Sequence, residues 1–198
     1  NLATHMALRA KKTVAYFSVE MAKESVMMRL LAGESKISMG EIRTGRIQDA
    51  SWPKLIQAAG AISEAPLFID DTAGISPFEI RARCRRLKAT HGLDCIMIDY
   101  LQMMSLKQKT DNREREVSEI SKNLKGIAKE LNVPIIALAQ LNRGVEGRAD
   151  RRPMLSDLRE SGSIEQDADV IMMLYRDDYY DKEDQEKAGH AEVIIGKQ

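Results

Sequence analysis

The stretch Leu93–Met104 reads LDCIMIDYLQMM and decides the fold class. Its apolar run, Cys95–Ile98, is short and lacks two-residue alternation, which is typical of a strand buried on both faces of a parallel sheet. The run ends at an acid, Asp99, where the strand would leave the sheet. Ligands gather outside the carboxyl ends of strands in open α/β sheets, so Asp99 is a candidate to hold Mg²⁺. Many α/β strands also end in a solvated acid, and this stretch alone does not identify a metal site.

Length and composition narrow the protein class. The 198 residues are enough for one domain with a sizeable core and too few for two comfortable ones. Thirty basic residues balance thirty acidic ones, so the chain as a whole has no strong electrostatic attraction for DNA or for an anionic membrane. Any such contact would have to come from a local basic patch. Cys84 and Cys95 have no metal-ligand spacing, as expected of a reduced protein. No signal peptide and no apolar run of roughly 20 residues is found, so we expect a cytoplasmic protein with no membrane contact.

Strand and helix patterns alternate along the chain. Strands are predicted at residues 12–20, 66–71, 95–98, 133–140, 170–176 and 191–195. Helices are predicted at 1–9, 21–33, 51–63, 76–90 and 113–131, with a short helix or turn at 38–45 and a tight turn and short helix at 161–169. Residues 142–160 carry five arginines and little periodicity, which predicts a mobile, basic surface segment. The alternation predicts an α/β fold with a mostly parallel central sheet and helices on both faces.

Polar side chains stand at three successive strand exits: Glu20, Asp99 and Gln140. Parallel strands open on the same edge of a sheet, so these residues are predicted to share one phosphoryl-transfer site. The Gly-rich loop G-x-x-x-x-G-K-[ST], which would cradle the phosphates, does not occur in the sequence. Either the protein is no nucleotide hydrolase, or the sequence starts inside the helix that follows the loop.

Five stretches resemble one family. They are VAYFSVEM at Val14–Met21, RTGRI at Arg43–Ile47, IMIDYLQMM at Ile96–Met104, NREREVSEISKNLKGIAKELNVPIIALAQLNR at Asn112–Arg143 and SDLRESGSIEQDAD at Ser156–Asp169. They resemble the C-terminal motor domain of DnaB-type bacterial replicative DNA helicases, over essentially the whole chain. The resemblance implies a single RecA-like ATPase domain over residues 1–198. It also implies a phosphate-binding loop just before the sequence and an arginine finger just after it, so we expect the 198 residues alone to be inactive.

The resemblance assigns catalytic roles to the three strand-exit residues. Glu20 resembles the glutamate that polarises the attacking water, Asp99 the Walker B acid that holds Mg²⁺, and Gln140 the sensor of the γ-phosphate. Each role has a simpler structural alternative. Glu20 could be a strand-end acid that helps to start the next helix, and Gln140 an amide that caps a strand end.

Further residues match positions that bind nucleotide or DNA in the family. Arg29 resembles an arginine that contacts the nucleotide in the family. From the sequence alone it could equally be a surface residue without this role. Lys197, with Gln198 beside it, resembles the lysine that reaches the neighbouring subunit's nucleotide. Arg159, Glu160 and Gly162 resemble the loop that holds single-stranded DNA by its phosphates, where arginine and exposed amides bind phosphate oxygens without reading bases. A structural salt-bridge network is the alternative for this loop.

The resemblance therefore implies an ATP- and Mg²⁺-dependent DNA helicase. A homohexameric ring would hydrolyse ATP between its subunits and move along single-stranded DNA from 5′ to 3′. Its expected binding partners are primase and a helicase loader. Two other functions stay open. One is a RecA-like recombination or repair ATPase, which fits the motif at 157–169 less well, and the other is a non-catalytic RecA-like scaffold that binds DNA.

Overall fold

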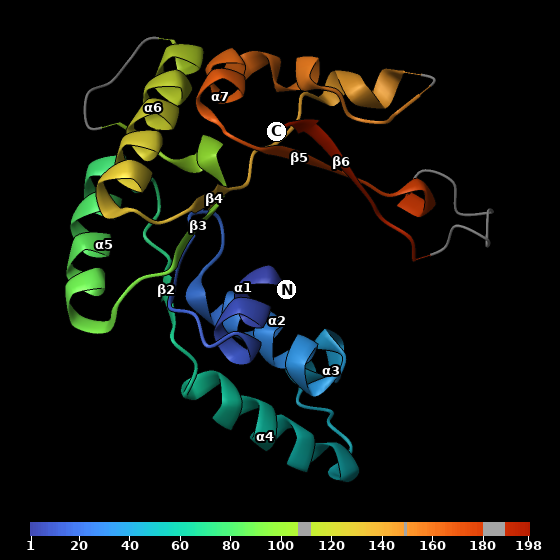
Figure 1. The fold of residues 1–198 in the computed structure, drawn as a ribbon. Coiled ribbons are helices and arrows are strands. Elements are labelled where there is room, and N and C mark those ends of the chain that lie inside the picture. Colours follow the sequence, from blue (N-terminus) through green and yellow to red (C-terminus); the bar gives the residue numbers. More distant parts are fainter. Residues whose placement is uncertain (107–111, 149, 180–188) are drawn as a thin grey trace. The chain divides into compact units, whose positions relative to one another are not determined.

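The structure forms two compact units (Figure 1). It is a computed structural model that describes residues 1–106, 112–148, 150–179 and 189–198, with residues 159–161 and 178 described by their backbone alone. The first unit comprises Asn1–Gln108 and Gly126–Ala139, and the second comprises Lys109–Lys125 and Gln140–Gln198. The long helix α6 (Arg113–Leu131) belongs to both.

A parallel sheet is the centre of the first unit. In the described part of the chain its strands are β1 (Val14–Ser18), β2 (Leu67–Asp70), β3 (Cys95–Asp99) and β4 (Ile135–Ala137), in the order β2-β1-β3-β4. All three neighbouring pairs are parallel. The structure thus confirms the α/β class and the strand that was expected at Cys95–Ile98.

The helices of the first unit largely follow the sequence patterns. They are α1 (Leu2–Thr4) continuing into the π-helical turn η1 (His5–Arg9), α2 (Lys23–Ser35), α3 (Met39–Thr44), the turn η2 (Asp49–Ser51), α4 (Trp52–Ser63), α5 (Pro77–His91), the turn η3 (Leu101–Met103) and the end of α6. Reciprocal side-chain and backbone hydrogen bonds between Ser76 and Glu79 start α5. Helix α2 runs two residues beyond its predicted end and stops where Lys36 adopts a left-handed conformation, with φ of 59°.

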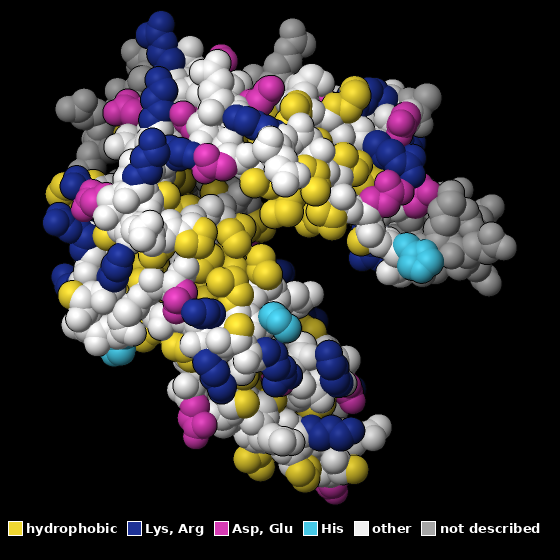
Figure 2. Space-filling view, viewed as in Figure 1, with side chains coloured by type: hydrophobic (Ala, Val, Ile, Leu, Met, Phe, Trp, Pro, Cys, Tyr) yellow, Lys and Arg dark blue, Asp and Glu magenta, His cyan; other side chains and the backbone are white. Residues whose placement is uncertain are grey.

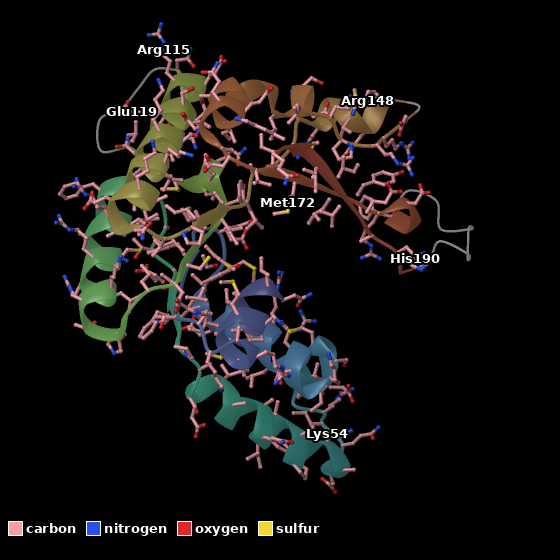
Figure 3. The ribbon with its side chains drawn as sticks, in the orientation of Figure 1. Lys54, Arg115, Glu119, Arg148, Met172 and His190 are labelled. Atoms are coloured by element: carbon pink, nitrogen blue, oxygen red, sulfur yellow. The ribbon has the colours of Figure 1, made fainter. Side chains whose placement is uncertain are left out.

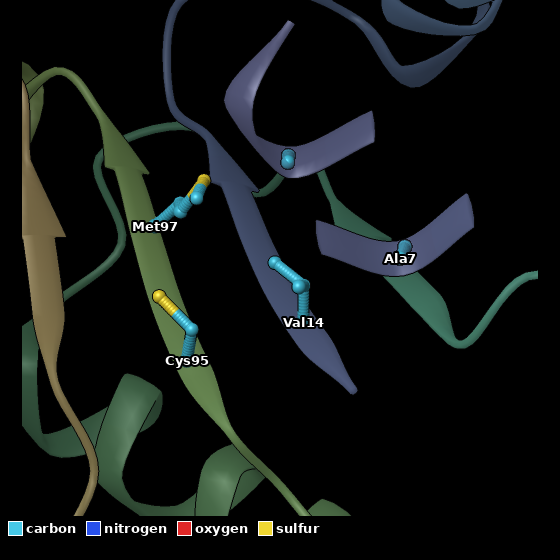
Figure 4. Close-up of a cluster of buried hydrophobic side chains, with 5 residues drawn as sticks. Ala7, Val14, Cys95 and Met97 are labelled. Carbon is cyan, nitrogen blue, oxygen red and sulfur yellow. The ribbon is translucent and has the colours of Figure 1, made fainter. Parts of the chain in front are cut away.

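One face of this sheet packs against the first helix of the chain (Figure 4). Val14 on β1 is paired with Cys95 on β3, and Tyr16 with Met97, so these four side chains share a face. Val14, Cys95 and Met97 form a buried cluster with Ala3 and Ala7. The small alanine side chains let the helix approach the sheet closely, which explains why this short N-terminal helix is part of the core.

Helix α5 covers the opposite face (Figure 1). The ring of Phe68 on β2 lies 5.0 Å from the ring of His91, and Arg83 forms an ion pair with Asp70. The guanidinium of Arg81 lies 2.7 Å from the Glu130 carboxylate, which joins α5 to the end of α6. Helices therefore cover both faces of the sheet, as the sequence predicts.

Both cysteines are free and buried in this unit. Burial raises the pKa of the Cys84 thiol to about 12 and that of Cys95 to about 11. Both thiols are therefore protonated at neutral pH and behave as core side chains rather than as nucleophiles.

The second unit contains an antiparallel strand pair. Its elements are the first part of α6, the turns η4 (Arg143–Gly147) and η5 (Leu155–Ser161), helix α7 (Gly162–Asp167), strand β5 (Ile171–Tyr175), the turn η6 (Asp177–Tyr179) and strand β6 (Glu192–Lys197). The hydroxyl of Ser163 donates a hydrogen bond of 2.8 Å to that of Ser118, which ties α7 to α6. Residues 142–160, for which the sequence predicts little regular structure, contain η4 and most of η5.

At Gly196, strand β6 lies close to side chains of β5 and η5. A Cβ atom on Gly196 would lie 2.7 Å from Cε of Met173 and 2.9 Å from Cδ2 of Leu155. Any larger residue would push the strand away from η5 or move both side chains.

We expect Ile96→Ala to lower the free energy of unfolding by about 2–5 kcal/mol, because Ile96 is fully buried in β3 and its loss leaves a cavity. Urea titration of the 198-residue chain measures this loss. The matched control is Ile56→Ala on α4, where the side chain is 68% exposed and the expected change is below about 0.5 kcal/mol. Similar losses in the two variants would contradict the placement of the core.

Asp70→Asn should destabilise the chain at neutral pH and much less in acid. Burial acts to raise the pKa of Asp70, but hydrogen bonds from Arg83 and Thr72 outweigh it and the pKa is lowered. Because the pKa of Asp70 is lower in the folded state, the ionised carboxylate stabilises the fold at any pH above its unfolded-state pKa of about 3.9. This stabilisation is lost as the pH falls through the folded-state pKa. We expect a loss of about 1 kcal/mol at pH 7 that shrinks near pH 3, measured by urea unfolding. An equal loss at both pH values would show that the carboxylate charge has no part in it.

Candidate nucleotide site

The parallel register brings Glu20 and Asp99 to one edge of the sheet. Ser18, the last residue of β1, pairs with Asp99, the last residue of β3, and the backbone N–H of Val19 donates to the Asp99 carbonyl at 2.7 Å. Glu20 follows directly in the bend before α2, with its side chain exposed. The predicted meeting of these two acids at a shared carboxyl edge is therefore seen in the path of the backbone.

A buried hydroxyl fixes the bend that carries Glu20. Ser18 is 1% exposed, and its Oγ donates a hydrogen bond of 2.7 Å to the carbonyl of Met21. This bond closes the chain around Glu20, so the flanking backbone is held while the carboxylate faces solvent. A water-activating acid needs this combination of a fixed backbone and an accessible side chain.

Tyr16 holds the carboxylate of Asp99. Its phenolic oxygen donates a hydrogen bond of 2.8 Å to Oδ2 of Asp99. Burial, together with this hydrogen bond and the negative charge of Asp99, raises the pKa of Tyr16 far above its usual range, so the phenol remains a donor. The charge of Arg29 on α2 acts in the opposite direction on the same phenol, which places Arg29 near the pair. The sequence analysis missed Tyr16, although its position two residues before Ser18 puts it on the same sheet face as Asp99.

Asp99 is suited to a Mg²⁺ site in which phosphate and water oxygens supply most of the ligands. Such an ion needs only one or two protein carboxylates. Within the described ranges no three His, Cys, Asp or Glu side chains lie close enough together to coordinate one metal ion. These residues therefore form no metal site that consists of protein ligands alone. The Asp99 carboxylate, oriented by Tyr16, is the group that would hold Mg²⁺. The peptide bond that follows it, between Asp99 and Tyr100, is cis.

Gln140 lies in the second unit. Strand β4 ends at Ala137, so the predicted strand of residues 133–140 is too long, and Gln140 stands in the segment beyond the strand end. Its exposed side chain lines an open pocket with Asn142 and Arg143. Because Glu20 and Asp99 belong to the first unit, the convergence of all three residues stays a prediction.

The candidate DNA loop follows a buried acid. Arg159 and Glu160 lie in η5, but their side chains are outside the described part of the structure, and Gly162 begins α7. Asp157, only 9% exposed, accepts hydrogen bonds from Arg148 and from the backbone of Met154. The sequence analysis did not single out Asp157 or Arg148, because no local pattern links an acid to an arginine in an aperiodic segment.

Lys197 contacts α7 within its own unit. Its Nζ donates to the backbone carbonyls of Glu165 at 2.7 Å and Gln166 at 3.4 Å, near the carboxyl end of that helix. Gln198 follows it and is exposed. The predicted contact of both residues with a neighbouring subunit's nucleotide is not tested by a single chain and stays a prediction.

Basic and acidic side chains lie around an apolar area on the face in view. Figure 2 shows lysine and arginine side chains interspersed with aspartate and glutamate, in keeping with a formal net charge of zero. A net charge of zero gives no strong overall field toward DNA. In the described ranges no helix is both long and apolar enough to cross a membrane.

Comparison with curated proteins finds close relatives. The chain is 54% identical over 199 residues to "Replicative DNA helicase DnaC" of Bacillus subtilis (strain 168), covering 100% of this chain and 44% of the relative. It is 51% identical to "Replicative DNA helicase DnaB" of Geobacillus stearothermophilus, with the same two coverages. The chain thus spans less than half the length of these relatives.

Solved structures match the fold. The structure titled "ATPase Domain of G40P" superposes with a TM-score of 0.94 at 44% identity, over 99% of this chain and 70% of that one. "The Structure Of A DnaB-Like Replicative Helicase And Its Interactions With Primase" also gives a TM-score of 0.94 at 44% identity, over 99% of this chain and 47% of that one. These matches confirm the predicted RecA-like class. The family model described as "DnaB-like helicase C terminal domain" matches residues 1–198, and the chain therefore belongs to the DnaB-like helicase C-terminal domain family.

Proposed function

We propose that this chain is the ATPase motor of a replicative DNA helicase, forming one motor domain over residues 1–198. The observation that carries the proposal is the pairing of Ser18 with Asp99, which brings Glu20 and Asp99 to the same carboxyl edge in a member of this family. The printed names of the relatives, all replicative DNA helicases, support the reaction.

The chemistry at this edge is ATP hydrolysis. Glu20 orients the attacking water and accepts its proton, and Asp99, held by Tyr16, is the acid for Mg²⁺. Bound Mg²⁺ would offset the negative charge of the β- and γ-phosphates. Gln140 is the sensor of the γ-phosphate, Arg29 contacts the nucleotide, and Lys197 with Gln198 contacts the nucleotide of the adjacent subunit.

Movement along DNA requires contacts that do not depend on base sequence. Arg159, Glu160 and Gly162 provide them through a charge-assisted bond and exposed backbone amides on phosphate oxygens. We propose a homohexamer around one DNA strand, with primase and a helicase loader as partners. One similar structure is titled for its interactions with primase, which supports the first partner. A cytoplasmic location follows from the proposed role in replication.

In the complete protein, Glu20→Gln should remove ATP hydrolysis while nucleotide binding and ring assembly persist. The amide keeps the size and polarity of the side chain but cannot accept a proton, and loss of a general base costs about 10²-fold or more. Steady-state ATPase assays and binding of a fluorescent ATP analogue measure the two effects separately. Glu24→Gln, at an exposed acid in the first turn of α2, is the matched control and should retain turnover. Near-normal turnover in Glu20→Gln would remove this residue from the mechanism.

Arg159→Ala should weaken binding of the complete protein to single-stranded DNA about equally for all base sequences. Loss of one phosphate contact should also reduce the slope of log affinity against log salt by about 0.7, the value for single strands. Fluorescence anisotropy with several oligonucleotides at a series of salt concentrations measures both. Arg86→Ala, at an exposed arginine of α5, is the control. Weakening that is confined to certain base sequences would mean that the loop reads bases.

A further inference from the structure

Three segments of the second unit meet at the side chain and backbone of Asp157. Its Oδ2 accepts a hydrogen bond from the backbone N–H of Met154 at 2.8 Å, and its carbonyl accepts one from the backbone N–H of Asn142 at 3.0 Å. The guanidinium of Arg148 completes the set, with Nη1 at 3.1 Å from Oδ1 and Nη2 at 2.7 Å from Oδ2. Asp157 thus contacts residues 148 and 154 through its carboxylate and residue 142 through its backbone carbonyl.

Arg148, labelled in Figure 3, binds this acid as a two-pronged fork through Nη1 and Nη2. Its Nη2 also donates to the carbonyl of Arg152 at 2.9 Å, so the guanidinium spans both sides of the turn. The Nε atom of Arg148 is buried and has no hydrogen-bond partner among the described residues.

The contacts of Asp157 link two parts of the proposed machinery. Asn142 follows Gln140, the proposed γ-phosphate sensor, by two residues, and Asp157 precedes Arg159, the proposed DNA contact, by two residues. The hydrogen bond between Asn142 and Asp157 is a direct connection between the two. A shift of the backbone at Gln140 would therefore reach η5 within a few residues, provided that Arg148 keeps Asp157 in place.

A second ion pair in the same unit has similar geometry, but its arginine side chain contacts strand β6 rather than Asp157. Arg152 contacts Glu192 with Nε at 3.0 Å and Nη2 at 2.6 Å, again as a fork. Its two side chains are 45% and 47% exposed, against 29% and 10% for Arg148 and Asp157. Exposed pairs are screened by solvent and contribute little, which makes Arg152 a suitable control.

We infer that Arg148 is a positioning residue: its fork on Asp157 transmits the nucleotide state sensed at Gln140 to the loop that carries Arg159 and Gly162. The inference rests on the proposed function, because it requires both a nucleotide sensor and a DNA loop. Lysine would keep the charge of Arg148 but lose the planar fork that fixes Asp157 in one orientation. The nucleotide dependence of DNA affinity should then be lost although both sites remain.

The test uses the complete protein and its variants Arg148→Lys and Arg152→Lys. The affinity for a fluorescent oligothymidylate is measured with a non-hydrolysable ATP analogue and again with ADP, and the ratio of the two dissociation constants reports the coupling. Coupling between sites typically changes affinity by about 5- to 150-fold. We expect a ratio in this range for the wild type and for Arg152→Lys, and a ratio near one for Arg148→Lys, with nucleotide affinity unchanged in all three.

The outcomes separate the inference from the proposed function. A wild type whose two dissociation constants are equal would overturn the inference. An ATPase assay with and without the oligothymidylate tests the proposed function, and a wild type without DNA-stimulated hydrolysis would overturn both. A coupled wild type whose ratio is unchanged in Arg148→Lys would overturn the inference alone, as would equal weakening in both nucleotide states, which a merely structural role would cause. If Arg148→Lys does not fold, Asp157→Asn decides by the same ratio, because the amide oxygen still accepts from Met154. Failure of both variants to fold would mark the pair as structural and overturn the inference.

Discussion

The parallel pairing of β1 with β3 is the constraint on which the other features of the first unit depend. Five residue pairs from Val14 and Cys95 to Ser18 and Asp99 define it. This register decides which side chains meet Ala3 and Ala7, and it places Glu20 next to Asp99. A slip by one residue would turn the side chains of a strand to the opposite face, which would break the alanine-lined core and the candidate site together.

The candidate site combines a rigid base with exposed reactive groups. Tyr16 orients Asp99, and Ser18 closes the bend around Glu20, through two hydrogen bonds that both originate on β1. Glu20 itself remains exposed. Loops placed by a rigid scaffold commonly carry chemistry in this way, because the backbone is held by the sheet while the side chain stays accessible to water and ligand.

Polar contacts anchor an aperiodic segment of the second unit. The segment after Gln140 is held by the Arg148 fork on Asp157 and by the Arg152 pair with Glu192. Polar contacts have defined directions, so they specify the path of an aperiodic segment that contributes few residues to a core.

Local sequence patterns were enough to predict the α/β class, the bounds of α6 and the Ser76–Glu79 start of α5, and longer motifs predicted the family. They also predicted Glu20 and Asp99 at strand exits. The hydrogen bond of Tyr16 to Asp99 and the fork of Arg148 on Asp157 were found only in the folded structure. Those partners are 83 and 9 residues apart, and what brings them together is strand register in one case and the packing of turns in the other, neither of which leaves a periodic pattern in the sequence.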